Sequence, residues 1–348
     1  MPDQVTQLRQ EVQRNCDIAD AHHAGNYTLC IYLLKMREFF RWEKRFPLTA
    51  NLPKSELGAW IETREGLWDN LLDEHFRSLN IDGAQFHPFD TEAINRKLLP
   101  LGLVYSGGVA GRSMAHFFLA DVLRTEEREG FPVLVAADEH ARCMAAPPAM
   151  MLNNVIFVRR ESLRRMLWEK IEEWSWRKRN DAMARAMAHY DFDGSFDAAL
   201  EQMTDNETES AILHEVGECL AQDKLGDSWH DMLAAIAGTR AEIVARAVRD
   251  HIADCSVTLP RLIAADNRAA LHFYFANFTG MRRSIFPELR EAYLGWAEGA
   301  PMHSLDALVR LGQERWPATA DAMLERYLAA PEAAAEAIAE IVPLGCEV

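Results

Sequence analysis

Residues 101–161 are LGLVYSGGVAGRSMAHFFLADVLRTEEREGFPVLVAADEHARCMAAPPAMMLNNVIFVRRE. The pattern of apolar residues in this stretch differs from that of the rest of the chain. The stretch contains three short runs that are rich in β-forming residues: Leu101–Tyr105, Pro132–Ala136 and Val155–Val158. Such runs favour strands. We expect one helix between the first two runs and a proline-containing loop before the third. The stretch therefore predicts a small three-stranded insert and not a complete α/β domain.

Helical patterns dominate on both sides of this stretch, where apolar residues recur at intervals of three and four. Helices are expected at 3–23, 27–45, 55–78, 90–98, 161–190, 205–225, 228–237, 239–264, 268–279, 286–298, 303–315 and 318–341. The predicted fold class is mainly α, a multi-helix bundle with a small three-stranded β-containing insert. The predicted segments are an N-terminal helical segment (1–99), a small α/β insert (100–160) and a C-terminal helical bundle (161–348). These three segments can pack as one compact unit.

The composition excludes several classes of protein. A chain of 348 residues, 49% of them hydrophobic, can bury a large core without metals or disulfides. Its formal net charge of −16 repels phosphate backbones, so no nucleic-acid partner is expected. The N-terminal residues lack the apolar core of a signal peptide, and no run approaches the roughly 18 apolar residues of a membrane span. The six cysteines form no C-x-x-C pair. We therefore expect reduced thiols, no membrane insertion and a cytoplasmic location.

The sequence SGGVAGRS, residues 106–113, follows a predicted strand and precedes a predicted helix. In that context backbone N–H groups can wrap a phosphate. Nucleotide or phosphate binding from Gly107 to Ser113 is therefore one hypothesis. The segment matches neither the P-loop pattern nor the dinucleotide-binding pattern. The alternative is a tight turn in which Gly107, Gly108 and Gly111 supply unusual backbone angles.

A second candidate lies in TDNETESAILHEVGE, residues 204–218, where Glu207, His214 and Glu218 fall on one face of the predicted helix. That face could offer all three side chains to a metal. Alternatively, it is the wet face of a surface helix, since apolar residues cluster on the opposite side. Glu207 also fits a T-x-x-E capping box with Thr204, which would use its carboxylate at the helix N-terminus.

Other histidines and carboxylates are predicted to lie on apolar helix faces. His251 lies in the middle of the apolar face of 239–264, with Asp254 on its flank. His23 extends the apolar stripe of the first helix, and Glu43 shares the apolar face of the second. Buried groups of these types need partners. Those partners are either ordinary ones, such as a carbonyl or an arginine, or a metal. The predicted metal ligands are His23, Glu43, His214, Glu218, His251 and Asp254.

The segment LHFYFANFTGMRR, residues 271–283, combines four aromatic side chains with His272 and Asn277. An aromatic run of mixed spacing is typical of a hydrophobic core. The functional alternative is an apolar ligand cavity, in which His272 and Asn277 are the polar groups that bind the ligand or cofactor.

Residues 15–44, NCDIADAHHAGNYTLCIYLLKMREFFRWEK, resemble the N-terminal block of an uncharacterised bacterial protein family of unknown function. The resemblance implies a match along the whole chain and brings no activity or assigned residues. A looser similarity is to the carboxylate-bridged di-metal helical bundles, in which a glutamate seven residues before a histidine resembles Glu207 and His214. No E-x-x-H occurs in the chain, nor does H-x-x-x-D-x-x-H. That similarity therefore concerns the fold class more than the chemistry.

Three functions remain open at this point. The first is a metal-dependent oxidoreductase that holds iron or manganese and acts on a small or lipophilic substrate, because imidazoles and carboxylates suit these metals. The second is a non-catalytic ligand-binding or scaffold protein that receives a partner or an apolar small molecule. The third is nucleotide or phosphate binding at the glycine-rich segment. Neither the substrate nor the oligomeric state follows from the sequence.

Overall fold

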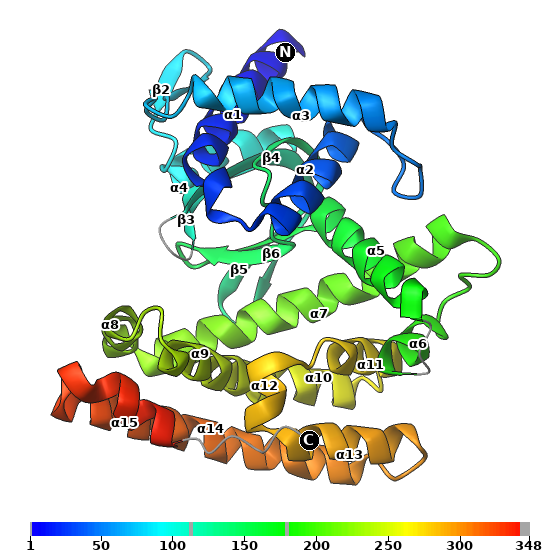
Figure 1. The fold of residues 1–348 in the computed structure, drawn as a ribbon, viewed down its shortest axis with the longest axis vertical. Coiled ribbons are helices and arrows are strands. Elements are labelled where there is room, and N and C mark those ends of the chain that lie inside the picture. The colour runs from blue at the N-terminus through cyan, green and yellow to red at the C-terminus, as the bar shows by residue number, and fades with distance from the viewer. Residues whose placement is uncertain (1, 111–113, 178–180, 342–348) are drawn as a thin grey trace. The chain divides into compact units, whose positions relative to one another are not determined.

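The computed structural model describes residues 2–110, 114–177 and 181–341 (Figure 1). The chain forms two compact units. Unit 1 consists of Met1–Glu127 and Pro132–Trp168, and unit 2 of Arg128–Phe131 and Glu169–Val348. Among the helices of the described residues, none has both the length and the apolar character that crossing a membrane requires.

Unit 1 contains a five-stranded mixed sheet, formed by residues that the structure describes. Its strands are β3 (Leu103–Ala110), β4 (Met114–Arg128), β5 (Phe131–Arg142), β6 (Ala149–Leu152) and β7 (Val155–Arg159). The strand order is β3-β4-β5-β7-β6. β5 and β7 are parallel, whereas β3–β4 and β6–β7 are antiparallel. A separate two-stranded hairpin pairs β1 (Leu79–Ile81) with β2 (Ala84–Phe86).

The prediction of a small three-stranded insert in an otherwise helical bundle is therefore wrong. The segment expected to contain a helix between the first two runs instead contains the end of β3 and the whole of the long strand β4, whereas the second run, Pro132–Ala136, lies in β5. Strands β4 and β5 meet at a turn in which Glu129 and Gly130 both have positive φ, 50° and 88°. In a hairpin, a turn with two successive residues of positive φ has a backbone twist that matches the twist of the two flanking strands. The arginine, leucine and glutamate residues before the turn favour a helix by propensity, but pairing within the sheet overrides that preference.

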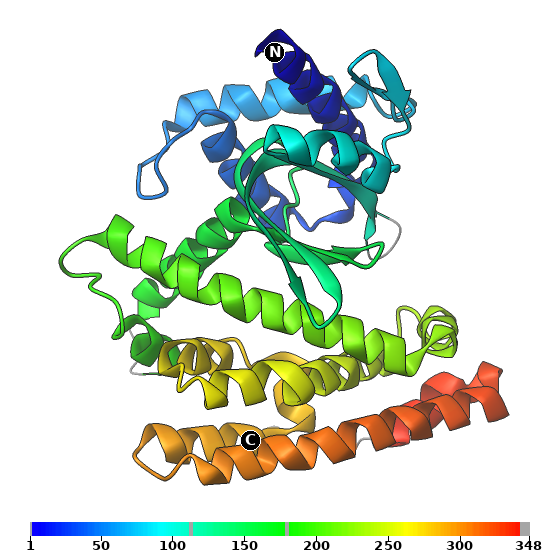
Figure 2. The same ribbon diagram turned by 180° about the vertical axis from the view of Figure 1, so that it is seen from behind.

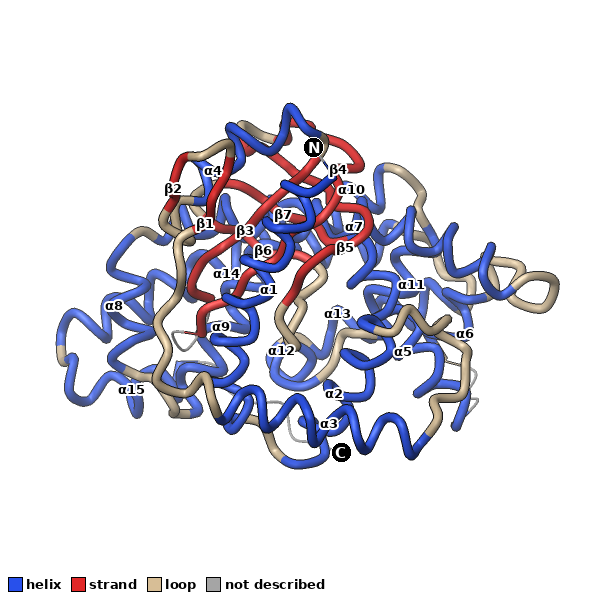
Figure 3. The backbone as a smooth tube through the Cα atoms, turned by 90° about the horizontal axis from the view of Figure 1, so that it is seen from above, coloured by secondary structure: helices blue, strands red, loops and turns tan. Residues whose placement is uncertain are grey.

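The sheet curls into a half-barrel, which Figures 2 and 3 show from two further directions. A Cβ atom placed on Gly108 in β3 would lie only 2.5 Å from a methyl carbon of Leu152 in β6. Because β3 and β6 are the two edge strands, this contact means that the curl brings opposite edges of the sheet together. Gly108 permits the approach because it has no side chain.

Helices cover the convex side of the half-barrel. The residues of this core are Leu8, Val12, Cys16 and Ala19 of α1 (Pro2–His23), Ile94 and Leu98 of α4 (Thr91–Leu98), and Leu103, Tyr105, Phe117, Leu119 and Ala141 of the sheet. The opposite face of α1 packs with α2 (Leu29–Glu43) and α3 (Lys54–Asp69) around Phe39, Phe40, Trp60 and Trp68. Unit 1 thus combines a three-helix layer with a curled sheet.

Unit 2 is helical apart from the tip of the β4–β5 hairpin. Helix α5 (Arg160–Arg177) leads into it. The helices that follow are α6 (Ala182–Met187), α7 (Phe196–Leu225), α8 (Asp227–Ala235), α9 (Arg240–Ala253), α10 (Leu259–Ala264), α11 (Arg268–Ala276), α12 (Gly280–Ile285), α13 (Pro287–Ala297), α14 (His303–Ala329) and α15 (Ala334–Ile341). A π-helical turn, Asp254–Thr258, joins α9 to α10. Buried aliphatic and aromatic residues from α7 to α15 form one continuous core.

Helix α7 begins earlier than predicted. Its N-cap is Ser195, whose hydroxyl accepts a hydrogen bond from the Ala198 N–H. Thr204 therefore lies inside the helix, where its hydroxyl bonds the Leu200 carbonyl. The predicted capping box of Thr204 and Glu207 is wrong, and Glu207 is a buried residue of the helix interior.

Candidate functional site

The six predicted metal ligands are divided between the two units. Two of them, His23 and Glu43, belong to unit 1. His23 ends α1 and is half-buried, and burial together with the neighbouring His22 lowers its pKa. The carboxylate of Glu43 accepts a hydrogen bond from Trp60 Nε1 at 2.8 Å and forms an ion pair with Arg64. Glu43 lies on a largely apolar helix face, where a carboxylate requires a partner, and that partner is an arginine.

In unit 2 the structure brings three predicted ligands together: His214 and Glu218 of α7 and Asp254 of the π-helical turn. His214 Nδ1 lies 3.0 Å from Asp254 Oδ1, and its Nε2 lies 3.5 Å from Glu218 Oε1. The Asp254 carboxylate is fully buried. It also accepts hydrogen bonds from the Tyr274 hydroxyl at 2.9 Å and from Arg282 Nη2 at 2.5 Å. We call these five residues the Asp254 network.

Opposing effects set the ionisation of this network. Burial alone would raise the pKa of Asp254, but the charge of Arg282 and the bond from His214 hold it well below its usual range. Burial would likewise lower the pKa of His214, yet its bonds to Asp254 and Glu218 raise it well above the usual value. The raised pKa favours the imidazolium form of His214, in which both ring nitrogens carry protons. A metal would have to displace those protons before it could bind the ring.

The close approach of the helices positions this network. A Cβ atom on Gly217 would lie 2.7 Å from the Ala253 carbonyl oxygen, so only glycine allows α7 to pack this tightly against the end of α9. The π-helical turn then begins at Asp254 itself. Such turns occur frequently at functional positions in helices. Gly217 and the turn together place His214 within hydrogen-bond distance of a residue 40 positions later.

His251 makes its hydrogen bond and its ring contacts with residues other than the three grouped ligands. Its Nε2 lies 2.9 Å from the Arg282 carbonyl oxygen, and its ring stacks on Trp316 with centroids 4.6 Å apart. Phe278 and Phe286 pack against its edges. Burial, the largest effect, lowers its pKa to about 4. His251 is therefore a neutral imidazole in an aromatic core.

The aromatic segment holds the two predicted cofactor-binding residues. His272 Nδ1 lies 3.0 Å from the Tyr293 hydroxyl, and its ring packs on Trp296 with centroids 4.9 Å apart. Burial lowers the pKa of His272 to about 4. Asn277 donates a hydrogen bond to the Phe273 carbonyl at the end of its own helix. Both side chains thus have partners within the helical core.

Metal coordination needs several ligands around one point. Within the described ranges 2–110, 114–177 and 181–341, no group of three or more histidine, cysteine, aspartate or glutamate side chains is arranged to hold a metal ion. The Asp254 network contains three such residues, but Arg282 and Tyr274 occupy the carboxylate of Asp254. Iron or manganese binding stays a prediction.

The predicted phosphate-binding segment is only partly described. Residues 107–109 belong to strand β3, and residues 111–113 lie outside the described residues. A Cβ atom on Gly107 would lie 2.2 Å from the Pro88 carbonyl oxygen, so this glycine is required by packing. No helix follows directly, because β4 begins at Met114.

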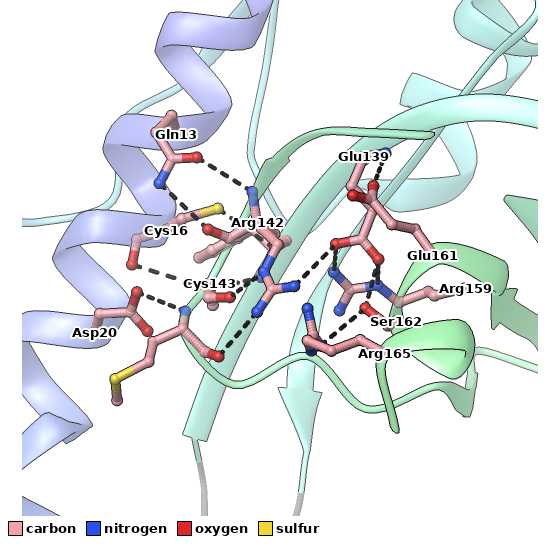
Figure 4. A network of polar contacts seen from close by, with 12 residues as sticks. Gln13, Cys16, Asp20, Glu139, Arg142, Cys143, Arg159, Glu161, Ser162 and Arg165 are labelled. Atoms are coloured by element: carbon pink, nitrogen blue, oxygen red, sulfur yellow. Dashed lines mark hydrogen bonds and ion pairs between the residues drawn. The ribbon is translucent and has the colours of Figure 1, made fainter. Parts of the chain in front are cut away.

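A second polar network links the sheet of unit 1 to α5 (Figure 4). The fully buried Glu139 carboxylate accepts hydrogen bonds from Arg159 Nε at 3.1 Å, Arg159 Nη2 at 2.6 Å and the Ser162 hydroxyl at 2.5 Å. Glu161 accepts a hydrogen bond from the Glu139 N–H, and burial raises the Glu161 pKa to about 7. This network joins β5, β7 and the first turn of α5.

Arg142 extends this network to α1, as Figure 4 also shows. Its Nη1 lies 3.8 Å from Glu139, while its remaining guanidinium nitrogens donate to the carbonyls of Cys143 and Met144. Its backbone exchanges two hydrogen bonds of 3.2 Å with the Gln13 side chain. Buried groups held by several hydrogen bonds in this way stabilise one arrangement of helix and sheet, although Arg142 Nη1 itself has, among the polar groups of the described residues, only the ion pair with Glu139.

The first half of α2 presents a different kind of surface. Leu29, Ile31, Leu33 and Leu34 are exposed by 70%, 47%, 46% and 53%. Cys30 between them is exposed as well. We call residues 29–34 the α2 turn. Scattered exposed leucines are ordinary, but a contiguous apolar group of this kind marks an interaction site.

A groove of about 540 Å³ adjoins the α2 turn. Its walls come from the end of α1 and from α2 and α3. The lining residues are Ala21, Ala24, Gly25, Tyr27, Leu29, Tyr32, Glu65, Trp68, Asp69 and Leu72. Trp68 is nearly buried, whereas Leu72 is 53% exposed. We call this the Trp68 groove.

Comparison with known proteins places the chain in a family. Residues 7–159 match the N-terminal domain, and residues 164–344 the C-terminal domain, of a family of unknown function, DUF6866. The chain belongs to this family. The resemblance to an uncharacterised family is thereby confirmed. No curated protein and no solved structure matches the chain.

For this DUF6866 member, sequence reasoning missed the α2 turn. The apolar face that Glu43 shares on this helix is formed by Leu29, Leu33, Met36 and Phe40. Met36 and Phe40 are buried, but Leu29 and Leu33 are exposed. The signal was present in LCIYLL, residues 29–34, where apolar residues surround the helix and one core cannot cover every side.

Proposed function

We propose that the protein is a non-catalytic binding protein that holds a partner protein on the α2 turn. One observation carries the proposal: four large aliphatic side chains within residues 29–34 of one helix are about half exposed or more. Burying such a side chain contributes about 1.5–3 kcal/mol. A partner that covers the α2 turn would gain this free energy several times over.

The two polar networks can be explained by their contribution to fold stability, so they do not compete with the α2 turn as the place where a partner binds. In the Asp254 network each charged group contacts an opposite charge, and in the Glu139 network the buried carboxylate binds Arg159 and Ser162. Networks satisfied in this way stabilise a fold. The phenylalanines of the aromatic segment, Phe273, Phe275 and Phe278, are buried in the core of unit 2. The α2 turn is therefore a better candidate for receiving a partner than the aromatic segment.

Site-specific photo-crosslinking in the producing cells tests the proposal. A photoreactive phenylalanine at Leu33 is expected to give discrete covalent adducts, because a bound partner lies against this position. The matched control carries the same group at Leu328 of α14, which is 66% exposed and lies outside the α2 turn. Adducts from position 33 alone support the proposal. Equal adducts from both positions, or none from position 33, contradict it.

A metal-dependent oxidoreductase is the second candidate. The observation in its favour is that His214 lies 3.0 Å from Asp254 and 3.5 Å from Glu218. Elemental analysis of protein purified without chelators tests it. Stoichiometric iron or manganese that is lost in His214→Ala would support this function over the first, and sub-stoichiometric metal would exclude it.

A further inference from the structure

The Trp68 groove combines aromatic walls with carboxylates. Tyr27, Tyr32 and Trp68 supply the rings, and Glu65 and Asp69 lie one helical turn apart on α3. The Tyr32 hydroxyl donates to Glu65 Oε1 at 2.8 Å. Burial and this bond raise the pKa of Tyr32, so the hydroxyl keeps its proton and orients the carboxylate. Aromatic faces beside carboxylates are the surroundings that a protein provides for a cation.

The negative charge of this groove is not neutralised locally. Neither Glu65 nor Asp69 forms an ion pair within the part of the chain that the structure describes. Arg64, the neighbouring cation on α3, is held by Asp17 and Glu43. Lys35 lies over the Tyr27 ring at 5.1 Å, and the described residues that line the groove themselves include two carboxylates and no lysine or arginine. The groove therefore carries a net negative charge directly beside an exposed apolar helix.

We propose that the Trp68 groove binds a lysine or arginine side chain of a basic amphipathic helix, whose apolar face covers the α2 turn. The inference rests on the proposed function and adds the chemistry of the partner. Helices dock in this way by placing apolar residues in a groove at spacings of three and four. A cation on the same helix would lie against Glu65, Asp69 and the partly exposed Tyr32 ring. The other two rings are less open to it, since Trp68 is nearly buried and Lys35 already covers the Tyr27 ring.

Charge also argues against the other occupants of this surface. A second copy of the chain in a symmetric contact would bring Glu65 and Asp69 close to their own counterparts, in a molecule whose net charge is already −16. An anionic membrane would meet the same carboxylates. A basic helix satisfies both the apolar and the acidic part of the surface.

Fluorescence anisotropy with synthetic peptides tests the inference. The probe is a labelled amphipathic helix of leucine and lysine, compared with a leucine–glutamate helix and with a scrambled leucine–lysine peptide. The groove variant is Glu65→Gln/Asp69→Asn. Its matched control, Glu291→Gln/Glu298→Gln, removes the same charge from exposed positions of unit 2. A third variant, Leu33→Ser/Leu34→Ser, alters the α2 turn.

The leucine–lysine helix is expected to bind, and the groove variant to weaken its binding by about tenfold or more, against about twofold or less for the control. Loss of binding in Leu33→Ser/Leu34→Ser with unchanged binding in the groove variant would overturn the inference while leaving the proposed function in place. Loss of binding in the groove variant with unchanged binding in Leu33→Ser/Leu34→Ser would overturn the proposed function, because the peptide would then bind without the α2 turn. Equal binding of the scrambled peptide would show attraction by charge alone and contradict both.

Two further measurements separate the remaining occupants. Sedimentation of the wild-type chain is expected to show a species whose mass does not change with concentration. A dimer that is lost in Leu33→Ser/Leu34→Ser would identify a second copy as the occupant and overturn the inference. Flotation with phosphatidylcholine vesicles, with and without phosphatidylglycerol, is expected to leave the protein unbound. Binding that depends on Leu33 and Leu34 would identify a membrane instead.

Discussion

Asp254 and Glu207 are both buried carboxyl groups of unit 2, yet their pKa values are shifted in opposite directions. Asp254 lies against Arg282 and His214, and these cations keep it ionised despite burial. Glu207 has Asn206 as a neutral neighbour at 3.3 Å, and burial raises its pKa to about 8. The difference arises from the partners, since burial alone penalises the charged form of either group.

This difference predicts a pH-dependent stability. Glu207 has a folded pKa of about 8, above its value in the unfolded chain, so its contribution is complete at acid pH and is lost as pH rises through 8. Wild-type protein should therefore lose unfolding free energy between about pH 5 and pH 8, because this single carboxyl group contributes a slope of at most ~1.4 kcal/mol for each step of one in pH. Glu207→Gln should lose less. Urea unfolding at the two pH values measures both.

Asp254→Asn provides the contrast. The pKa of Asp254 is depressed, so the stabilisation from its own ionisation is present above the unfolded value of about 3.9. Its bond to His214 raises the pKa of that imidazole, and this second contribution is lost as pH rises above the ordinary histidine value of about 6.5. Removal of the Asp254 carboxylate should cost about 3–5 kcal/mol at pH 5 and less at pH 8, because the partly buried Arg282 and His214 lose the buried carboxylate that they share. A Glu207→Gln variant with the same pH slope as the wild type would refute the assignment of that slope to Glu207.

At the scale of elements, the closure of the half-barrel depends on Gly108 and Leu152. Gly108→Ala should destabilise the protein by about 1 kcal/mol, because the new methyl group overlaps the flexible, half-buried Leu152 side chain and forces it to shift. In Gly108→Ala/Leu152→Ala that overlap is absent, so the double variant should be more stable than the sum of the single effects predicts, by about 1 kcal/mol. Urea unfolding of the four proteins measures this coupling.

Gly58 of α3 supplies the control for this cycle. A Cβ atom there would meet nothing within 4 Å, so Gly58→Ala should stabilise the protein by about 0.5–1 kcal/mol. Strictly additive effects at Gly108 and Leu152 would show that the two edge strands do not meet in solution.

Local patterns predicted the helices more successfully than the sheet. Periodicity located α1, α2 and α4 closely, whereas the helix expected at 239–264 is divided into α9, the π-helical turn and α10. The β4–β5 hairpin was missed, since Arg124, Glu126 and Glu127 favour a helix and only pairing with a distant strand reveals the strand. Within the candidate site, helix geometry correctly placed His214 and Glu218 on one face, but the contacts of Tyr274 and Arg282 with Asp254 depend on how four helices pack.

At the scale of the whole molecule, the reactivity of the cysteine thiols shows the unfolding of each unit separately. Of the cysteines in the described residues, Cys30 is exposed, Cys16 and Cys143 are buried in unit 1, and Cys219 and Cys255 are buried in unit 2. Burial raises the pKa of Cys16 well above its usual value and that of Cys219 to about 12. Such thiols react slowly, because the thiolate is the nucleophile.

A pulse of iodoacetamide along a urea series should therefore modify Cys30 in the native protein and the buried thiols only after unfolding. Cys16 and Cys143 should become reactive at the same urea concentration, because they share one core. Peptide mapping by mass spectrometry gives the extent of reaction at each site. Cys16 reacting as fast as Cys30 without urea would contradict the described packing of α1.

The π-helical turn Asp254–Thr258 has a consequence for how the chain can vary in length. Its hydrogen bonds span five residues where those of an α-helix span four, so it holds one residue more than an α-helical turn. Deletion of a single residue there would leave a continuous α-helix, with every preceding side chain rotated by about 100° relative to those that follow. Such a deletion would preserve the helix but turn Asp254 away from either His214 or Arg282. The Asp254 network therefore constrains the number of residues in this segment as well as their identity.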